Sequence, residues 1–191
     1  IGSDGVVMKG ELKFEVTEHD LGKIPETKTK IMLNLATPDT AFEKSFLPQK
    51  GSGLVREEFV IASVIGIHPL ALLNYNKLPA NLKKEINRRT LGWSDKPKFY
   101  VDKLAYGISR IAAALYPHPA IVRFSDFKTN EYRQLLGGEL YEPEEQNPML
   151  GWRGASRYYD DRFKEAFGLE CKAVKKAREE MGLINVTPMI P

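Results

Sequence analysis

The stretch Pro119-Ala-Ile-Val-Arg-Phe-Ser-Asp126 is a short apolar run that ends in an arginine and, three residues later, an aspartate. Its apolar residues, bounded by turn signals, predict a buried strand of the parallel kind. Arg123 would be poorly placed in a hydrophobic core. In α/β barrels and open α/β sheets, however, ligands bind at the carboxyl ends of the strands. We therefore predict that this strand ends at a binding site.

Two further segments have the same design. Gly51-Ser-Gly-Leu-Val-Arg56 and Pro148-Met-Leu-Gly-Trp-Arg153 are apolar runs that also end in an arginine. A guanidinium group is a planar fork of donors that matches the oxygens of carboxylates and phosphates. A single strand-end arginine is explained by a salt bridge to Glu58, Asp126 or a helix carboxylate. Three such arginines together indicate a pocket for an anion.

The remaining chain alternates predicted strands and helices, which is typical of a parallel sheet covered by helices and predicts the α/β class. Strands are predicted at 30–36, 51–56, 119–123, 148–153 and 185–191, and a half-exposed strand at 12–17. Helices are predicted at 37–46, 57–76, 78–89, 99–116 and 161–181. In the helix at 99–116 an apolar stripe is predicted to face the core: Tyr100, Leu104, Ile108, Ile111 and Leu115. Five main strands could form an open sheet on their own.

Composition limits the possible functions. A chain of 191 residues with 42% hydrophobic and 28% charged residues describes an ordinary soluble globular domain. The net charge of +3 is small and scattered, which argues against a nucleic-acid partner. The single cysteine fits a reducing cytoplasm, and no apolar run is long enough to span a membrane. Because the chain starts without methionine and stops inside an apolar run, we interpret it as a piece of a larger protein.

Several reactive or polar residues are better explained by structure than by chemistry. His19 is interpreted as a solvated linker residue, and His68, which precedes a proline, as a helix-start or packing residue. Cys171 is predicted on the buried face of the last helix, as a small core residue. The acidic group Glu142–Glu145 is predicted to be a solvated loop face and not a metal site. Asn34 is either an internal hydrogen-bonding residue or an amide that lines the pocket.

Three long segments resemble one enzyme family. They are Gly53-Leu-Val-Arg-Glu-Glu-Phe59, Ile121-Val-Arg-Phe-Ser-Asp-Phe-Lys-Thr-Asn-Glu-Tyr132 and Asn147-Pro-Met-Leu-Gly-Trp-Arg-Gly-Ala-Ser-Arg-Tyr158. They are similar to the PEP-utilising enzymes, most closely to the phosphoenolpyruvate synthases (pyruvate, water dikinases). Pyruvate phosphate dikinase and enzyme I of the sugar phosphotransferase system are more distant. The resemblance covers essentially the whole chain.

The resemblance implies a domain organisation that spacing alone does not give. Residues 1–10 correspond to the tail of the swivelling phosphohistidine domain and residues 11–29 to a linker. Residues 30–191 correspond to the first five strands of an eight-stranded (β/α) barrel of the TIM type, the PEP/pyruvate-binding domain. An incomplete barrel leaves two sheet edges unpaired, so we expect self-association into a homo-oligomer.

The resemblance also implies roles for the strand-end residues. Arg56 and Arg123 match the family's substrate-binding arginines, and Arg153 matches a further arginine of the pocket. Asp126 belongs to the same motif and is expected to orient Arg123 or a neighbouring water. Phosphoenolpyruvate carries both a phosphate and a carboxylate, which are the two groups that arginines bind best.

The activity implied for the parent enzyme converts ATP, pyruvate and water to AMP, phosphoenolpyruvate and phosphate through a phosphohistidine, with Mg²⁺ as cofactor. Several parts of the family's machinery do not appear in this chain. They are the ATP domain, the phosphorylated histidine, the magnesium-binding carboxylates and the cysteine of the later barrel strands that acts as an acid. We therefore expect no catalytic residue and no metal ligand here, and no dikinase activity from this piece alone. A non-catalytic anion-binding module is the alternative from another class.

Overall fold

Four parallel strands form the sheet of this protein, whose computed structural model describes residues 5–11 and 13–191. They are β1 (Leu33–Leu35), β2 (Ser52–Arg56), β3 (Ala120–Arg123) and β4 (Val186–Met189), in the order β1-β2-β3-β4. Each strand lies beside its predecessor in the chain. This order is that of a (β/α) barrel wall, whereas the order reverses in a doubly wound sheet. The protein is an α/β protein whose sheet is consistent with part of a TIM-type barrel.

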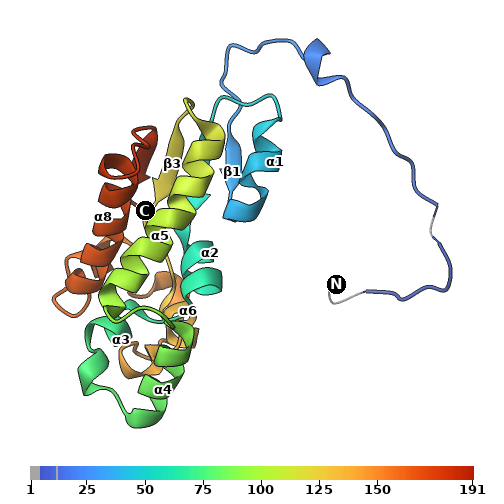
Figure 1. Cartoon of the computed structure of the whole chain (residues 1–191). Helices are drawn as coiled ribbons and strands as arrows, with labels where there is room; N and C mark the ends of the chain where they lie inside the picture. Colours follow the sequence, from blue (N-terminus) through green and yellow to red (C-terminus); the bar gives the residue numbers. More distant parts are fainter. Residues whose placement is uncertain (1–4, 12) are drawn as a thin grey trace.

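One face of the sheet is covered by helices. The long helix α5 (Lys96–Leu115) crosses it, with α8 (Lys164–Glu179) on one side and α1 (Ala41–Ser45) on the other (Figure 1). The predicted apolar stripe of α5 is buried, which confirms the assignment of that helix to the core. The shorter helices are α2 (Glu57–Val60), a π-helical continuation η3 (Ile61–Ile65), α3 (Pro69–Leu73), α4 (Ala80–Arg89), α6 (Thr129–Gln134) and α7 (Ala155–Tyr158).

The other face of the sheet is open in this chain. Val55 and Val122 are buried against the helices, whereas Leu54 and Ile121 on the opposite face are only partly buried. In a complete barrel this open face would line the interior. Asn34 of β1 is exposed in this chain.

The predicted strand at 148–153 is absent, so the sheet has four strands where five were predicted. Residues Pro148–Leu150 form a short 3₁₀ helix, η6, and the chain then continues as a loop to α7. The Asn147 side chain accepts a hydrogen bond from the backbone N–H of Met149, which starts the turn, and proline is favoured at the first position of a helix. Local turn chemistry therefore overrode the apolar composition of the run.

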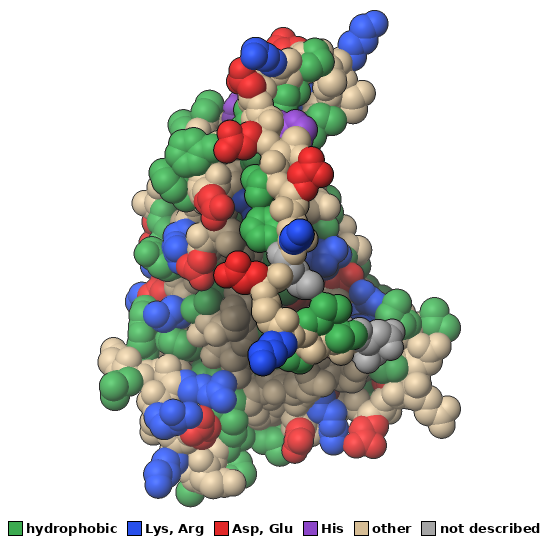
Figure 2. All heavy atoms as spheres, turned by 90° about the vertical axis from the view of Figure 1, so that its right-hand side faces the viewer, with side chains coloured by type: hydrophobic (Ala, Val, Ile, Leu, Met, Phe, Trp, Pro, Cys, Tyr) green, Lys and Arg blue, Asp and Glu red, His purple; other side chains and the backbone are tan. Residues whose placement is uncertain are grey.

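The half-exposed strand predicted at 12–17 is also wrong for residues 13–17, which pair with no other described segment; Leu12 lies outside the described residues. The segment described at residues 5–11 and 13–30 is exposed and runs away from the body, with one short 3₁₀ turn, η1 (Leu21–Lys23) (Figure 1). Apolar and charged side chains are interspersed along it (Figure 2). Alternating residues form a strand only where a partner strand supplies backbone hydrogen bonds.

Cys171 is exposed, which contradicts its prediction as a core residue. Helix α8 instead buries Ala166, Leu169, Ala173 and Ala177. These positions recur at steps of three and four and place Cys171 just outside the buried face. The apolar character of the thiol therefore led to a wrong prediction that Cys171 lies on the buried face of α8.

Candidate functional site

Two of the predicted arginines lie side by side where their strands end. Arg56 and Arg123 are the last residues of β2 and β3 and are directly paired across the two parallel strands. The preceding residues, Val55 and Val122, point toward the helices, and successive side chains of a strand point to opposite faces. Both guanidinium groups therefore extend from the open face, at the carboxyl end of the sheet.

Glu58, in the first turn of α2, fixes the position of Arg123. Its Oε1 accepts a hydrogen bond from Arg123 Nη2 at 2.6 Å and another from the backbone N–H of Asp126 at 2.8 Å. The side chains of Arg123 and Glu58 are only 22% and 12% exposed. Because α2 follows β2 without an intervening loop, this one carboxylate joins the end of β2 to the end of β3.

Asp126 pairs mainly with Arg153. The Arg153 Nε donates to Asp126 Oδ1 at 2.9 Å and its Nη2 donates to Oδ2 at 2.8 Å, which is the two-point geometry typical of strong arginine–carboxylate pairs. Arg123 Nη1 lies 3.6 Å from the same Oδ2, so Asp126 contacts both arginines. Arg153 reaches the site from the loop between η6 and α7, not from a strand end.

Arg56, Arg123, Arg153 and Asp126 all line one cavity of about 430 Å³ at this end of the sheet. Four cationic and three acidic side chains line it, which leaves one positive charge in excess: Arg56, Arg123, Lys128, Arg153, Glu58, Asp126 and Glu131. Among the described residues, no carboxylate forms an ion pair with Arg56. The cavity therefore offers a guanidinium that is available to an anion.

A buried cluster around Arg157 includes Trp152, the residue before Arg153 in the chain, and was not predicted from the sequence. Arg157 is fully buried and donates to Glu142 Oε1 and Oε2 at 2.6 and 2.7 Å. Its guanidinium carbon lies 4.0 Å from the centre of the Trp152 ring and 4.5 Å from that of Tyr132. Glu142 is only 4% exposed, so its prediction as part of a solvated loop face is wrong.

His68 completes this cluster and begins α3, as predicted for a helix-start residue. Its Nδ1 accepts from the backbone N–H of Leu70 at 3.2 Å, so Nε2 carries the proton and donates to Glu142 at 2.9 Å. Burial lowers the pKa of His68 and keeps the ring neutral. Burial alone would raise the pKa of Glu142, but the hydrogen bonds from His68 and Arg157 outweigh it and the pKa is lowered.

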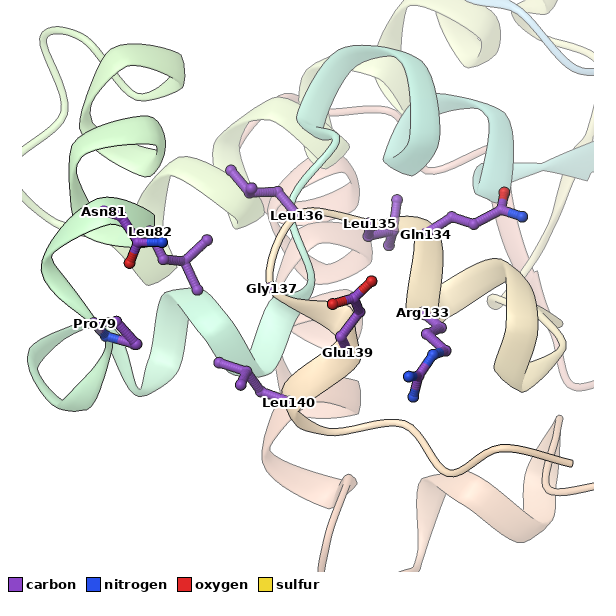
Figure 3. A pocket seen from close by; sticks show the side chains of 10 residues that line it. All are labelled: Pro79, Asn81, Leu82, Arg133, Gln134, Leu135, Leu136, Gly137, Glu139 and Leu140. Atoms are coloured by element: carbon purple, nitrogen blue, oxygen red, sulfur yellow. The ribbon is translucent and has the colours of Figure 1, made fainter.

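A second cavity, of about 450 Å³, lies between the start of α4 and the segment that follows α6 (Figure 3). Its lining is mainly aliphatic, with Leu82, Leu136 and Leu140 among its residues. Its one arginine, Arg133, pairs with Glu144 at 3.0 Å. This cavity contains none of the predicted site residues and no available arginine in the described part of the chain.

Within residues 5–11 and 13–191, no group of three or more His, Cys, Asp or Glu side chains is arranged to hold a metal ion. The carboxylates nearest the arginines, Glu58 and Asp126, already bind those arginines. The described helices also include none that is long and apolar enough to cross a membrane.

A parallel α/β sheet in barrel order, with a cavity lined by arginines at its carboxyl end, is the arrangement in which enzymes of the barrel class place their sites. The sequence matches the family described as PEP-utilising enzyme, PEP-binding domain, over residues 15–191. The chain belongs to this family.

Three curated relatives of this chain share the name phosphoenolpyruvate synthase. The chain is 54% identical to phosphoenolpyruvate synthase of Synechocystis sp. and 52% identical to that of Pseudomonas aeruginosa, in both cases over 100% of this chain and 24% of the relative. It is 48% identical to phosphoenolpyruvate synthase of Aquifex aeolicus, over 100% of this chain and 28% of the relative. The chain thus spans about a quarter of the length of these relatives.

Proposed function

We propose that this chain is part of the PEP/pyruvate-binding domain of a phosphoenolpyruvate synthase, and that the cavity at the ends of β2 and β3 binds pyruvate and phosphoenolpyruvate. The observation that carries this proposal is the convergence of Arg56, Arg123 and Arg153 on one cavity. The names of the relatives agree with it.

Each arginine has a proposed part in binding. Arg56, which has no ion-pair partner among the described residues, binds an anionic group of the substrate directly. Arg123 and Arg153 are held by Glu58 and Asp126, so they present fixed donors to the ligand. Hydrogen bonds to charged groups contribute roughly 1.5–3 kcal/mol each. Fixed cations of this kind also neutralise the charge that develops on a transferring phosphoryl group.

The proposed reaction of the full-length protein converts ATP, pyruvate and water to AMP, phosphoenolpyruvate and phosphate. A phosphohistidine domain of the same chain would supply the phosphoryl group, and this cavity would hold the pyruvate that receives it. Bound Mg²⁺ would supply further positive charge at the reacting oxygens. The described residues offer no ligand set for it, so we propose that its ligands, the ATP site and the phosphohistidine lie in other parts of the protein.

The domain boundaries are part of the same proposal. Residues 1–10 would end the phosphohistidine domain, 11–29 would be the linker, and 30–191 would form the first part of the barrel. We further propose a cytoplasmic homo-oligomer that needs neither a membrane nor a nucleic acid as partner, and a role for the parent enzyme in gluconeogenesis.

An assay of the full-length protein with ATP, Mg²⁺ and pyruvate tests this function. We expect AMP, phosphoenolpyruvate and phosphate to form without added phosphate. A strict requirement for phosphate, with release of pyrophosphate, would assign the protein to pyruvate phosphate dikinase. Absence of product under every condition would favour a non-catalytic anion-binding module. The chain of residues 1–191 alone should show no turnover.

A further inference from the structure

Two carboxyl groups are buried together beneath the cavity, and neither is explained by the binding of substrate. Glu57 is the first residue of α2 and Glu170 lies in the middle of α8; both are 0% exposed. Among the described residues, no lysine, arginine or histidine lies within ion-pair distance of either carboxyl. A buried carboxylate normally requires a cation or several hydrogen bonds.

The two carboxyls meet at the backbone of Ser125, on the segment that connects β3 to Asp126. The Ser125 N–H donates to Glu57 Oε1 at 3.0 Å and to Glu170 Oε2 at 3.2 Å. The Ser125 hydroxyl donates to Glu170 Oε1 at 2.7 Å, and the Tyr132 hydroxyl lies 3.4 Å from the same oxygen. Burial raises the pKa of Glu170, and the hydrogen bonds from Ser125 oppose that rise because they favour the ionised form.

Glu57 has a different environment. Its Oε2 is buried and accepts no hydrogen bond from any described residue. Burial raises the pKa of Glu57 well above its usual range, and the neighbouring Glu170 raises it further. Two adjacent buried carboxyls cannot both ionise, so a single proton is shared between them. The contacts assign that proton to Glu57, which can donate it to Glu170.

We propose that Glu57 and Glu170 form a proton-sharing pair that positions the Ser125–Asp126 backbone and, through Asp126, the guanidinium group of Arg153. The pair acts as a positioning device for the cavity and does not touch the substrate. Its part in binding rests on the proposed function, whereas the location of the proton does not.

Groups from α2, α5, α6 and α7, and the Ser125 peptide that follows β3, surround the two carboxyls. Glu58 of α2 faces it with a like charge, and the hydroxyls of Tyr100, Tyr132 and Tyr158 face it from α5, α6 and α7. The Tyr158 hydroxyl donates to the carbonyl of Ser125 at 2.6 Å, so the peptide is held from both sides. None of these groups is a cation that would stabilise a second negative charge.

Glu57→Gln and Glu170→Gln are expected to change the KM for pyruvate of the full-length protein by different amounts. In Glu57→Gln the amide still donates to Glu170 and still accepts from Ser125, so the KM for pyruvate should stay within about twofold of wild type. In Glu170→Gln an amide N–H₂ faces groups that are themselves donors, so the KM should rise roughly tenfold or more. Glu165→Gln changes an exposed residue of α8 and is the matched control; it should leave the KM for pyruvate unchanged.

The pH dependence of unfolding gives a readout that does not depend on activity. A carboxyl with a raised pKa in the folded state stabilises the protein below the pKa of the unfolded state and loses this contribution as pH rises toward the folded pKa. The melting temperature of Glu57→Gln should therefore equal that of wild type in acid and exceed it increasingly as pH rises above the ordinary carboxyl range. The infrared band of a buried protonated carboxyl should be present in wild type at neutral pH and absent in Glu57→Gln.

An infrared band that is unchanged in Glu57→Gln would overturn the assignment of the proton. Equal effects of Glu57→Gln and Glu170→Gln on the KM for pyruvate would overturn the positioning role. If the wild-type protein forms no phosphoenolpyruvate at all, the proposed function fails. The infrared and melting measurements would still decide whether the proton-sharing pair exists.

Discussion

Arg56 differs from the other two arginines of the cavity in what its removal would disturb. Loss of Arg123 would leave Glu58 without its cation, and loss of Arg153 would leave Asp126 with only the 3.6 Å contact to Arg123. Either change would combine a loss of binding with a loss of stability, because an unpaired, partly buried carboxylate is costly. Arg56 is exposed and has no such partner among the described residues, so its removal tests binding alone.

The buried pair of Glu142 and Arg157 should be a major determinant of stability. We expect Glu142→Gln to lower the free energy of unfolding by about 3–5 kcal/mol, because Arg157 would remain as a buried charge without its carboxylate. Chemical denaturation of the wild type and the variant measures this difference.

Glu144→Gln is the matched control, because its pair with Arg133 is 83% exposed on the glutamate side. Its cost should be at most about 1 kcal/mol. The pKa of Glu142 is lowered in the fold, so the contribution of the buried pair is present above the ordinary carboxyl range and is lost as pH falls. Equal losses of stability in the two variants at neutral pH would contradict the importance of the buried pair.

At the level of single residues, the sequence predicted which arginines follow apolar runs, but not which carboxylates hold them. Arg123 and Glu58 are 65 residues apart in sequence. Glu142 lies in a loop whose path local patterns do not specify, and its partner Arg157 lies in the short helix α7. The position of Arg157 in a segment rich in aromatic residues was the one available signal, since arginine stacks well on aromatic rings. Ion-pair partners of this kind are set by the tertiary fold.

Among the helices, α5 and α2 are in close contact at Gly107 and Val60. A Cβ added at Gly107 of α5 would lie 2.6 Å from Val60 Cγ1, whereas one added at Gly168 of α8 would meet no atom within 4 Å. Gly107→Ala should therefore destabilise the protein by about 1–3 kcal/mol through overpacking. Gly168→Ala should stabilise it by roughly 0.5–1 kcal/mol, because alanine loses less backbone entropy in a helix.

Thermal unfolding of the two glycine variants beside the wild type measures both effects. Both positions are glycines inside long helices, so the comparison separates packing from helix propensity. A gain of stability in Gly107→Ala would mean that α5 does not pack on α2 as closely as the structure indicates.

Long amphipathic helices could be predicted from the sequence, and short elements could not. In α5 the apolar positions recur over five turns, and every residue of the predicted stripe is buried. The run at 148–153 is too short for periodicity to distinguish a strand from a turn, and Asn147 and Pro148 direct it into a 3₁₀ helix. The phase of α8 failed at Cys171 because a thiol is compatible with either face.

On the scale of the whole molecule, the order of elements was enough to predict an α/β fold with a parallel sheet. The number of strands could not be predicted from that order, because one of the five strands predicted for the sheet is a turn. The convergence of strand-end arginines follows from parallel topology itself, since the carboxyl ends of parallel strands meet at one edge of the sheet. The proton-sharing pair of Glu57 and Glu170 could not be predicted, because it requires residues of α2 and α8 to meet at the backbone of Ser125.

The cavity at the ends of β2 and β3 is proposed to bind pyruvate and phosphoenolpyruvate. The most direct test is the exchange of label between pyruvate and phosphoenolpyruvate, measured beside the formation of the phosphohistidine from ATP, in full-length Arg56→Gln. Arg110→Gln is the control, because Arg110 lies on α5 and pairs with Asp39 at 2.8 Å, away from the cavity.

We predict that Arg56→Gln loses roughly tenfold or more of the exchange activity, as expected for one lost charge-assisted hydrogen bond, while phosphohistidine formation stays at the wild-type rate. Arg110→Gln should retain both activities. Wild-type exchange in Arg56→Gln, with an unchanged KM for pyruvate, would contradict the assignment of this cavity as the substrate site.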